Sequence, residues 1–118
     1  MLADDHIVVR QGLSNLINRE PDFEIIGEAS NGKEAVDLAR KIRPDVVLMD
    51  INMPQMDGVE ATRIIHSEDR DIRIIGFSMY QEESLRKALI DAGAIAYFSK
   101  QGASADLIRA IRNCFTQN

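Results

Sequence analysis

The chain has 118 residues, with 14 Lys and Arg against 19 Asp and Glu, so its formal net charge is −5. This length suits one domain with its own core and is too short for a core plus an output domain. The acidic balance argues against direct binding to nucleic acid, because phosphate contacts need clustered Lys and Arg.

The sequence carries no membrane or secretion signal. No apolar run approaches the length of a membrane span, and no signal peptide opens the chain. The single cysteine, Cys114, cannot form an internal disulfide, which fits reducing conditions. We therefore expect a cytoplasmic location, with Cys114 packed in the core.

The first part of the chain alternates apolar runs with helical patterns. Residues 1–3 are a short apolar run, residues 9–17 carry apolar side chains at helical spacing, and residues 23–28 predict a strand. Asn31, followed three residues later by Glu34, predicts the N-terminus of a second helix.

The same alternation continues to the end of the chain. Residues 46–50 are an uninterrupted apolar run ending in Asp50, which is typical of a strand buried on both faces. The remaining predicted elements are a helix over 58–67 with Asp57 as N-cap, a strand over 72–77, a helix over 81–92 with Gly93 as its C′ residue, a strand over 94–98 and a helix over 104–115.

Five predicted strands thus alternate with five predicted helices. This order indicates an α/β fold with a mostly parallel sheet wrapped by helices on both faces. Because the connections are short and no linker or repeat interrupts them, we expect a single domain over residues 1–118.

Polar residues follow the predicted strands at the points where they end. Asp4 and Asp5 follow the first strand, Asp50 ends the third, Ser78 follows the fourth and Lys100 comes after the fifth. Parallel strands place their carboxyl ends at one rim of the sheet, so these side chains should converge if strands one and three are neighbours. Converging carboxylates need a cation, and all-oxygen ligands suit Mg²⁺ or Mn²⁺.

This set of residues is suited to phosphoryl transfer. A divalent ion and a lysine spread the charge of a transferred phosphoryl group, while a carboxylate attacks phosphorus to give an acyl phosphate. Any single Asp at a strand end is most often a turn or N-cap residue. The repetition of such residues after several apolar runs is harder to explain in that way.

At these residues the sequence resembles a known family, the receiver domains of two-component response regulators. The resemblance covers essentially the whole chain. The matching residues are the Asp4-Asp5 pair, Asp50 with Met53-Pro54-Gln55-Met56-Asp57-Gly58, Ser78, Tyr97 and Lys100. The opening Asp-Asp-His-x-x-Val-Arg-x-Gly-Leu and the Lys-x-Gly-Ala-Ser near the end look most like the NarL/LuxR-type subgroup. The implied fold is a flavodoxin-like (βα)5 doubly wound parallel sheet, with strand order 2-1-3-4-5 and a truncated first strand.

The resemblance implies a role for each acidic residue. Asp50 would be the phosphoacceptor, taking phosphate from a sensor histidine kinase. Asp5 would bind Mg²⁺ directly and Asp4 through water, with Asp50 and the backbone carbonyl of Asn52 completing the protein ligands.

The resemblance also implies a switch. Lys100 would contact the phosphoryl group and Ser78 would donate its hydroxyl to it. Tyr97 would then turn inward and remodel the face formed by the fourth helix, last strand and last helix. Such a domain assists its own phosphorylation and dephosphorylation without being a turnover enzyme.

Members of this subgroup normally carry a DNA-binding helix-turn-helix domain after the receiver, through which they regulate transcription. No such domain is present in this sequence. A second departure from the family is Gln101, where many receivers have a proline after the lysine. A cis bond at Gln101 would cost about 3 kcal/mol, so we expect a trans peptide.

Three other interpretations stay open. A hydrolase with an Asp nucleophile would have a second acid two residues after it, where this chain has Asn52. A flavin-binding module would need a hydroxyl- and Gly-rich loop after the first strand, where Asp4, Asp5 and His6 stand. A receiver used only as an interaction surface would not need the complete acidic set.

Two further residues lie near the predicted site. His6 adjoins the acidic pair, but a first-turn helix position beside the site suits it better than a ligand role, because Mg²⁺ prefers oxygen. Met79 follows Ser78, where its size could tune the access of water to an acyl phosphate, although simple loop packing explains it equally well.

The first strand is short for a strand at the centre of a sheet. Strands typically have about five or six residues, and only three precede Asp4. We expect unpaired edges on strands two and three, an exposed apolar slot, low stability and a tendency to form a homodimer or exchange an element.

Overall fold

The structure, a computed structural model, describes residues 1–78, 83–99 and 104–114. Within them, one parallel sheet has the strand order β2-β1-β3-β4-β5, which confirms the predicted fold and order. The strands are β1 (Leu2–Ala3), β2 (Glu28–Ala29), β3 (Val46–Asp50), β4 (Arg73–Ser78) and β5 (Ala96–Ser99). The helices are α1 (Ile7–Asn18), α2 (Gly32–Ile42), α3 (Gly58–Glu68), α4 (Glu83–Ala92) and α5 (Ser104–Asn113).

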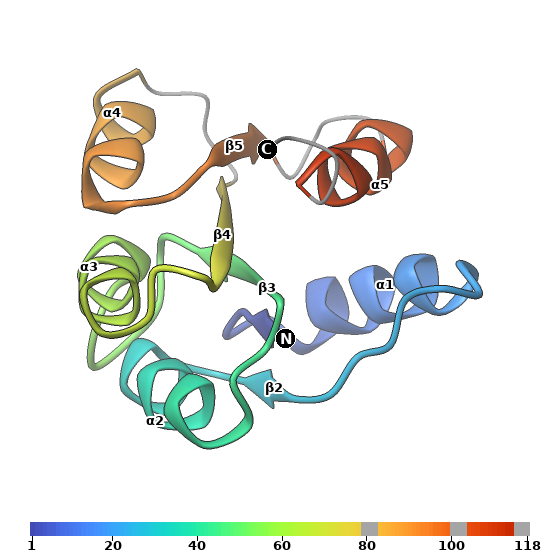
Figure 1. Ribbon diagram of the computed structural model, residues 1–118, viewed down its shortest axis with the longest axis horizontal. Coiled ribbons are helices and arrows are strands. Elements are labelled where there is room, and N and C mark those ends of the chain that lie inside the picture. Colours follow the sequence, from blue (N-terminus) through green and yellow to red (C-terminus); the bar gives the residue numbers. More distant parts are fainter. Residues whose placement is uncertain (79–82, 100–103, 115–118) are drawn as a thin grey trace.

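The helices form two layers around the sheet. Figure 1 shows α2, α3 and α4 on one side of the strands and α1 and α5 on the other. Each strand alternates its side chains between these layers, as its two-residue period requires. Val47 and Met49 face the α2–α4 side, while Leu48 between them packs toward Ile17 of α1 and Ile111 of α5.

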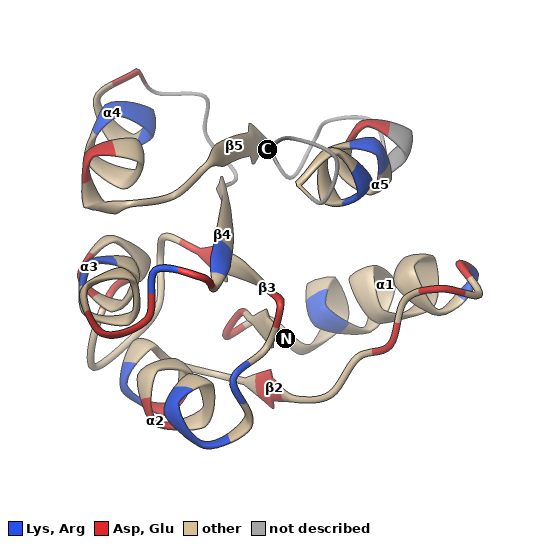
Figure 2. Ribbon diagram, in the orientation of Figure 1, with Lys and Arg blue, Asp and Glu red and all other residues tan. Residues whose placement is uncertain are grey.

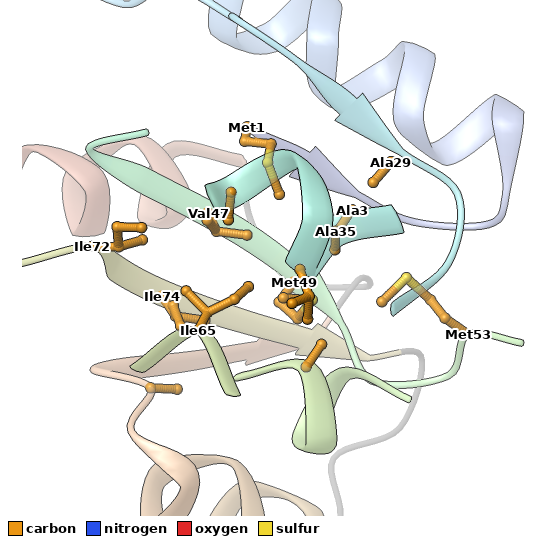
Figure 3. Close-up of a cluster of buried hydrophobic side chains, with 14 of the residues drawn as sticks. Met1, Ala3, Ala29, Ala35, Val47, Met49, Met53, Ile65, Ile72 and Ile74 are labelled. Atoms are coloured by element: carbon orange, nitrogen blue, oxygen red, sulfur yellow. The ribbon is translucent and has the colours of Figure 1, made fainter. Parts of the chain in front are cut away.

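The larger of the two cores lies on the α2–α4 side (Figure 3). Met49 and Ile74 are fully buried there, and Ile65 of α3 packs into the same cluster. Burying an aliphatic side chain of this size is worth about 1.5–3 kcal/mol. This layer therefore holds β3 and β4, the two adjacent strands that carry Asp50 and Ser78.

Helix ends follow the predicted capping signals. Asn31 accepts a hydrogen bond from the backbone N–H of Glu34 (2.8 Å), and Asp57 accepts one from Glu60 (2.9 Å), so both N-caps are confirmed. Gly93 adopts a left-handed φ of 122° directly after α4, and its N–H donates to the carbonyl of Ile90.

The second strand is much shorter than predicted. Residues 23–28 were expected to form it, but the ladder contains only Glu28 and Ala29, paired with Leu2 and Ala3. The reason is the length of β1, since residues 23–26 have no neighbouring strand to pair with at that end of the sheet. The N–H of Leu2 still donates to the carbonyl of Gly27 (3.1 Å), which is where the pairing stops.

A mainly apolar cavity of about 730 Å³ occupies this end of the sheet, as the short first strand predicted. It lies beside the start of β1, between residues 22–26, residues 44–48 and the inner faces of α1 and α5. The Met1 amine borders it and donates to the carbonyl of Val46 (2.9 Å). Burial lowers the pKa of this amine to about 6, and the nearby charge of Asp45 partly offsets the effect.

Arg112 closes one wall of the cavity. Its guanidinium donates to Glu20 (2.7 Å) and Asp22 and lies 4.7 Å from the centre of the Phe23 ring. The hydrogen bond from Arg112 lowers the pKa of the Asp22 carboxyl. These contacts hold the connection after α1 against α5, across the region where a longer β1 would pack.

We predict that adding three or four β-branched residues before Met1 raises the melting temperature. The added residues would fill the cavity, pair with residues 23–27 and replace the buried amine by an amide N–H. A gain of 1 kcal/mol shifts the midpoint of a small domain by about 4–8 °C. Calorimetry should therefore show an increase of at least about 5 °C, and ultracentrifugation should show less association.

An extension of the same length made of Gly and Ser is the matched control. It converts the amine to an amide but supplies no apolar side chains, so it should recover only part of the increase. Equal melting temperatures of the original and β-branched forms, with both monomeric, would show that the cavity does not lower the stability of the domain.

Candidate functional site

The register between β1 and β3 determines where the acidic residues lie. Leu2 pairs with Leu48 and Ala3 with Met49, so Asp4 and Asp50 come next, side by side at the carboxyl edge of the sheet. Both side chains are buried, with 0% and 1% of their surface exposed. Two carboxylates predicted from separate strand ends are thus brought together in the centre of the fold.

Asp5 and His6 complete a compact group at this edge. One ligand atom from each of Asp4, Asp5, His6 and Asp50 can be chosen so that all lie within 4.8 Å of one another. The carboxyl side chain of Asp5 is 31% exposed, so it lies at the mouth of the group. The predicted set of three carboxylates is therefore assembled, with an imidazole beside it.

Hydrogen bonds orient the two buried carboxylates. Asp4 Oδ1 accepts from the backbone N–H of His6 (2.8 Å), and Asp50 Oδ1 accepts from the backbone N–H of Asn52 (3.2 Å). The second bond ties the segment after β3 back to Asp50, and the Asn52 carbonyl belongs to this same segment. Each carboxylate is therefore oriented by a backbone N–H from the segment that directly follows its own strand.

Arg10 supports the acidic pair from α1. Its guanidinium donates to the backbone carbonyl of Asp4 (2.8 Å) and to Glu28 of β2 (3.1 Å). The sequence predicted no role for Arg10, because its contacts with Asp4 and Glu28, which are 6 and 18 residues away, depend on the direction of its side chain. Two signals could have indicated it: its position one turn into the helix that follows the acidic pair, and its place in the opening motif of the subgroup.

A glycine lets α3 begin close to Asp50. The N–H of Gly58 donates to the carbonyl of Ile51 (2.8 Å). A Cβ on Gly58 would lie 2.1 Å from the backbone oxygen of Asp50, which is a steric clash. The absence of a side chain at Gly58 therefore allows the connection after β3 to fold back beneath the site.

Ser78 ends β4 at the same edge of the sheet. It follows Phe77, which pairs with Asp50, and its side chain is completely buried. On the neighbouring strand, Tyr97 pairs with Gly76 and packs, half-buried, against the core on the α4 side. Ser78 and Tyr97 therefore lie on adjacent strands.

Lys100, Gln101 and Met79 lie outside the described residues. The predictions for the lysine, for the trans peptide that follows it and for the methionine therefore stay predictions. Lys100 is the next residue after β5 in the sequence.

The donor set fits a hard divalent cation. Three carboxylates converge within a few ångströms, and such like charges disfavour one another unless a cation neutralises them. Carboxylate oxygens are the ligands that Mg²⁺ and Mn²⁺ prefer. The arrangement can therefore hold such an ion next to a buried carboxylate that could act as a nucleophile.

The rest of the charge is distributed over the molecule. Figure 2 shows Lys and Arg on helices from both sides of the sheet, with Asp and Glu on the same helices or on nearby connections. Among the described residues, none of the helices is both long and apolar enough to span a membrane.

The comparisons with known proteins agree with this geometry. Residues 1–112 match the family of response regulator receiver domains. Transcriptional regulatory protein LiaR of Bacillus subtilis is 44% identical over 112 residues, covering 95% of this chain and 53% of LiaR. The chain spans about half the length of the curated relatives that it matches.

Solved structures show the same relationship. A LuxR-family two-component response regulator from Aurantimonas sp. SI85-9A1 superposes with a TM-score of 0.93 at 39% identity, covering 98% of this chain and 83% of that one. A chain in a CheX–CheY–BeF3–Mg²⁺ complex from Borrelia burgdorferi superposes with a TM-score of 0.91 at 30% identity, with coverages of 98% and 87%. This chain thus belongs to the receiver domains of two-component response regulators, and its relatives are regulators of the LuxR/NarL type.

Proposed function

We propose that this domain is a phosphorylation-driven switch in which Asp50 accepts a phosphoryl group from a sensor histidine kinase. The observation that carries the proposal is the pairing of β1 with β3, which places buried Asp50 beside buried Asp4 with Asp5 at the mouth. In the reaction an Asp50 oxygen attacks phosphorus, the bond from phosphorus to the donor's imidazole nitrogen breaks, and the phosphoryl group ends as an acyl phosphate.

The residues that would hold a divalent cation are Asp5, Asp4, Asp50 and the backbone carbonyl of Asn52. Bound there, Mg²⁺ or Mn²⁺ would offset the negative charge of the phosphoryl group and of the carboxylates. The chain itself orients Asp50 through the Asn52 N–H and orients Asp4 through the His6 N–H. Burial of Asp50 limits the access of water to its carboxyl group.

Phosphorylation would change the surface of the domain through three residues, Ser78, Lys100 and Tyr97. The Ser78 hydroxyl would donate to a phosphoryl oxygen, and the Lys100 ammonium would pair with the same group. Movement of Ser78 toward Asp50 would leave space beside β4, into which Tyr97 of β5 would turn. The surface expected to change is formed by α4, β5 and α5.

The remaining partners follow from the relatives. Because the curated relatives LiaR and DegU are transcriptional regulatory proteins about twice as long as this chain, we propose that residues 1–118 act as the receiver for a DNA-binding helix-turn-helix domain. This receiver would not itself contact nucleic acid, would work in the cytoplasm and could form a homodimer. It would not be a turnover enzyme, and a hydrolase is disfavoured by Asn52 two residues after the proposed acceptor.

Incubation with a small phosphodonor and Mg²⁺ is expected to add one phosphoryl group to Asp50. The product should be stable in acid and labile to base and hydroxylamine, as an acyl phosphate is, and it should not form without a divalent cation. Intact-protein mass spectrometry measures this directly. An Asp50→Asn variant should lose the label, and equal labelling of that variant would refute the assignment.

Asp57→Asn is the matched control for this loss. Asp57 is an exposed carboxylate in the connection that follows Asp50, and its side chain caps α3, a task that Asn also performs. This variant should be labelled like the wild type. Loss of labelling in both variants would indicate that the substitutions disturb the connection between β3 and α3, and would not identify Asp50 as the acceptor.

Ser78→Ala is expected to leave labelling largely intact while weakening the switch. Driving a two-state equilibrium from 1:99 to 99:1 takes about 5.5 kcal/mol of differential binding. One charge-assisted hydrogen bond supplies about 1.5–3 kcal/mol, so Ser78 must act together with Lys100 and the cation. Amide chemical shifts around Tyr97 should therefore change less on phosphorylation in the variant.

Ser78→Thr, which keeps the hydroxyl, is the comparison for this measurement. Its phosphorylation-induced shifts should approach those of the wild type. Identical amide chemical shifts around Tyr97 in phosphorylated wild-type and Ser78→Ala protein would show that Ser78 takes no part in the switch.

A further inference from the structure

The imidazole of His6 contacts the acidic group from its solvent-exposed side. His6 Nδ1 is 3.1 Å from Asp5 Oδ1 and 3.2 Å from Asp4 Oδ1, and it shares the 4.8 Å cluster with Asp50. The sequence predicted a position at the start of a helix beside the site, and His6 does precede the first residue of α1. The structure places a nitrogen donor among the three carboxylates.

The local backbone explains this position. His6 is the N-cap residue of α1, with φ −94° and ψ 108°, but its side chain makes no capping hydrogen bond. The backbone N–H of His6 donates to Asp4 while its carbonyl accepts from the N–H of Arg10 (3.0 Å), so both sides of the residue are fixed. The ring is thereby directed to the acidic pair and away from the helix end.

An imidazole changes which cations a carboxylate site favours. Mg²⁺ prefers oxygen ligands and gains little from a nitrogen. First-row transition-metal dications accept imidazole readily, and their affinity for mixed nitrogen and oxygen sites rises from Mn²⁺ through Co²⁺ and Ni²⁺. His6 therefore adds a donor that discriminates between these two classes of cation.

We propose that His6 is a metal ligand of this site and gives it a preference for transition-metal dications such as Ni²⁺ or Co²⁺ over Mg²⁺. The inference rests on the metal site of the proposed function. On binding, His6 Nδ1 would exchange its contacts with Asp4 and Asp5 for a bond to the cation. The identity of the bound ion would then depend on which metals are available to the protein.

Calorimetric titration with NiCl₂ and with MgCl₂ tests the proposal on the wild type and His6→Asn. Because loss of even an outer partner of a ligand costs about 10–100-fold in metal affinity, loss of a ligand should weaken Ni²⁺ binding by at least about tenfold. Mg²⁺ affinity should change by no more than about twofold, since no oxygen ligand is lost. His6 is 56% exposed at its side chain, so the variant should fold.

His66→Asn is the matched control, because His66 is the other histidine of the chain and lies on α3. It should leave both affinities unchanged. As a measurement that needs no variant, Zn²⁺ titration should move the imidazole ¹⁵N resonances of His6 in the wild type and leave those of His66 in place. Static His6 resonances at saturating Zn²⁺ would overturn the proposal.

The outcomes separate this inference from the proposed function. If Asp50 is labelled in Mg²⁺ while Ni²⁺ binds wild type and His6→Asn equally, the ligand role of His6 is wrong and the phosphoacceptor stands. If Ni²⁺ binding depends on His6 while Asp50 is never labelled, the metal ligand stands and the phosphoacceptor is wrong. Equal weakening of Ni²⁺ and Mg²⁺ in His6→Asn would contradict the preference.

Discussion

The pairing of Ala3 with Met49 places two carboxylates of the same charge side by side in the interior of this domain. Asp4 and Asp50 follow directly from this register, and Asp5 closes the group from the solvent side. Burying like charges costs free energy unless a cation balances them. The centre of the sheet is therefore built in a way that favours metal binding, and the proposed phosphoryl transfer depends on this arrangement.

The rest of the fold maintains the register at the carboxyl edge more firmly than at the amino edge. At the carboxyl edge, Arg10 holds the backbone of Asp4 and ties it to β2, while Gly58 lets α3 start against Asp50. At the amino edge, the short β1 leaves a cavity of about 730 Å³ and a buried amine at Met1. The site is thus assembled at the better packed end of the sheet.

Local signals were enough to predict most of the fold and the core of the site. The apolar runs that precede Asp50 and Ser78 predicted that both residues lie at strand ends, and Asn31, Asp57 and Gly93 marked helix ends that the structure confirms. These features depend on neighbours in the sequence, through strand periodicity and capping. The strand over 23–28 was overestimated, because its pairing depends on the length of another strand.

The features that sequence reasoning missed depend on contacts that are distant in sequence or on side-chain direction. Arg10 of α1 contacts Glu28 of β2, and no local sequence pattern predicts this contact. His6 adjoins the acidic pair in sequence, but its ring could equally have capped α1 without contacting that pair. Only the backbone geometry at the start of α1 turns it toward Asp4 and Asp5.

The most direct test of the central claim compares the free energy of unfolding of wild-type and Asp50→Asn protein with and without Mg²⁺. Removing one of the converging charges should make the metal-free variant more stable than the metal-free wild type. A ligand that binds only the folded state raises stability, so Mg²⁺ should stabilise the wild type more than the variant. A metal-free variant no more stable than wild type, with an equal gain from Mg²⁺ in both, would contradict a metal site built on opposed carboxylates.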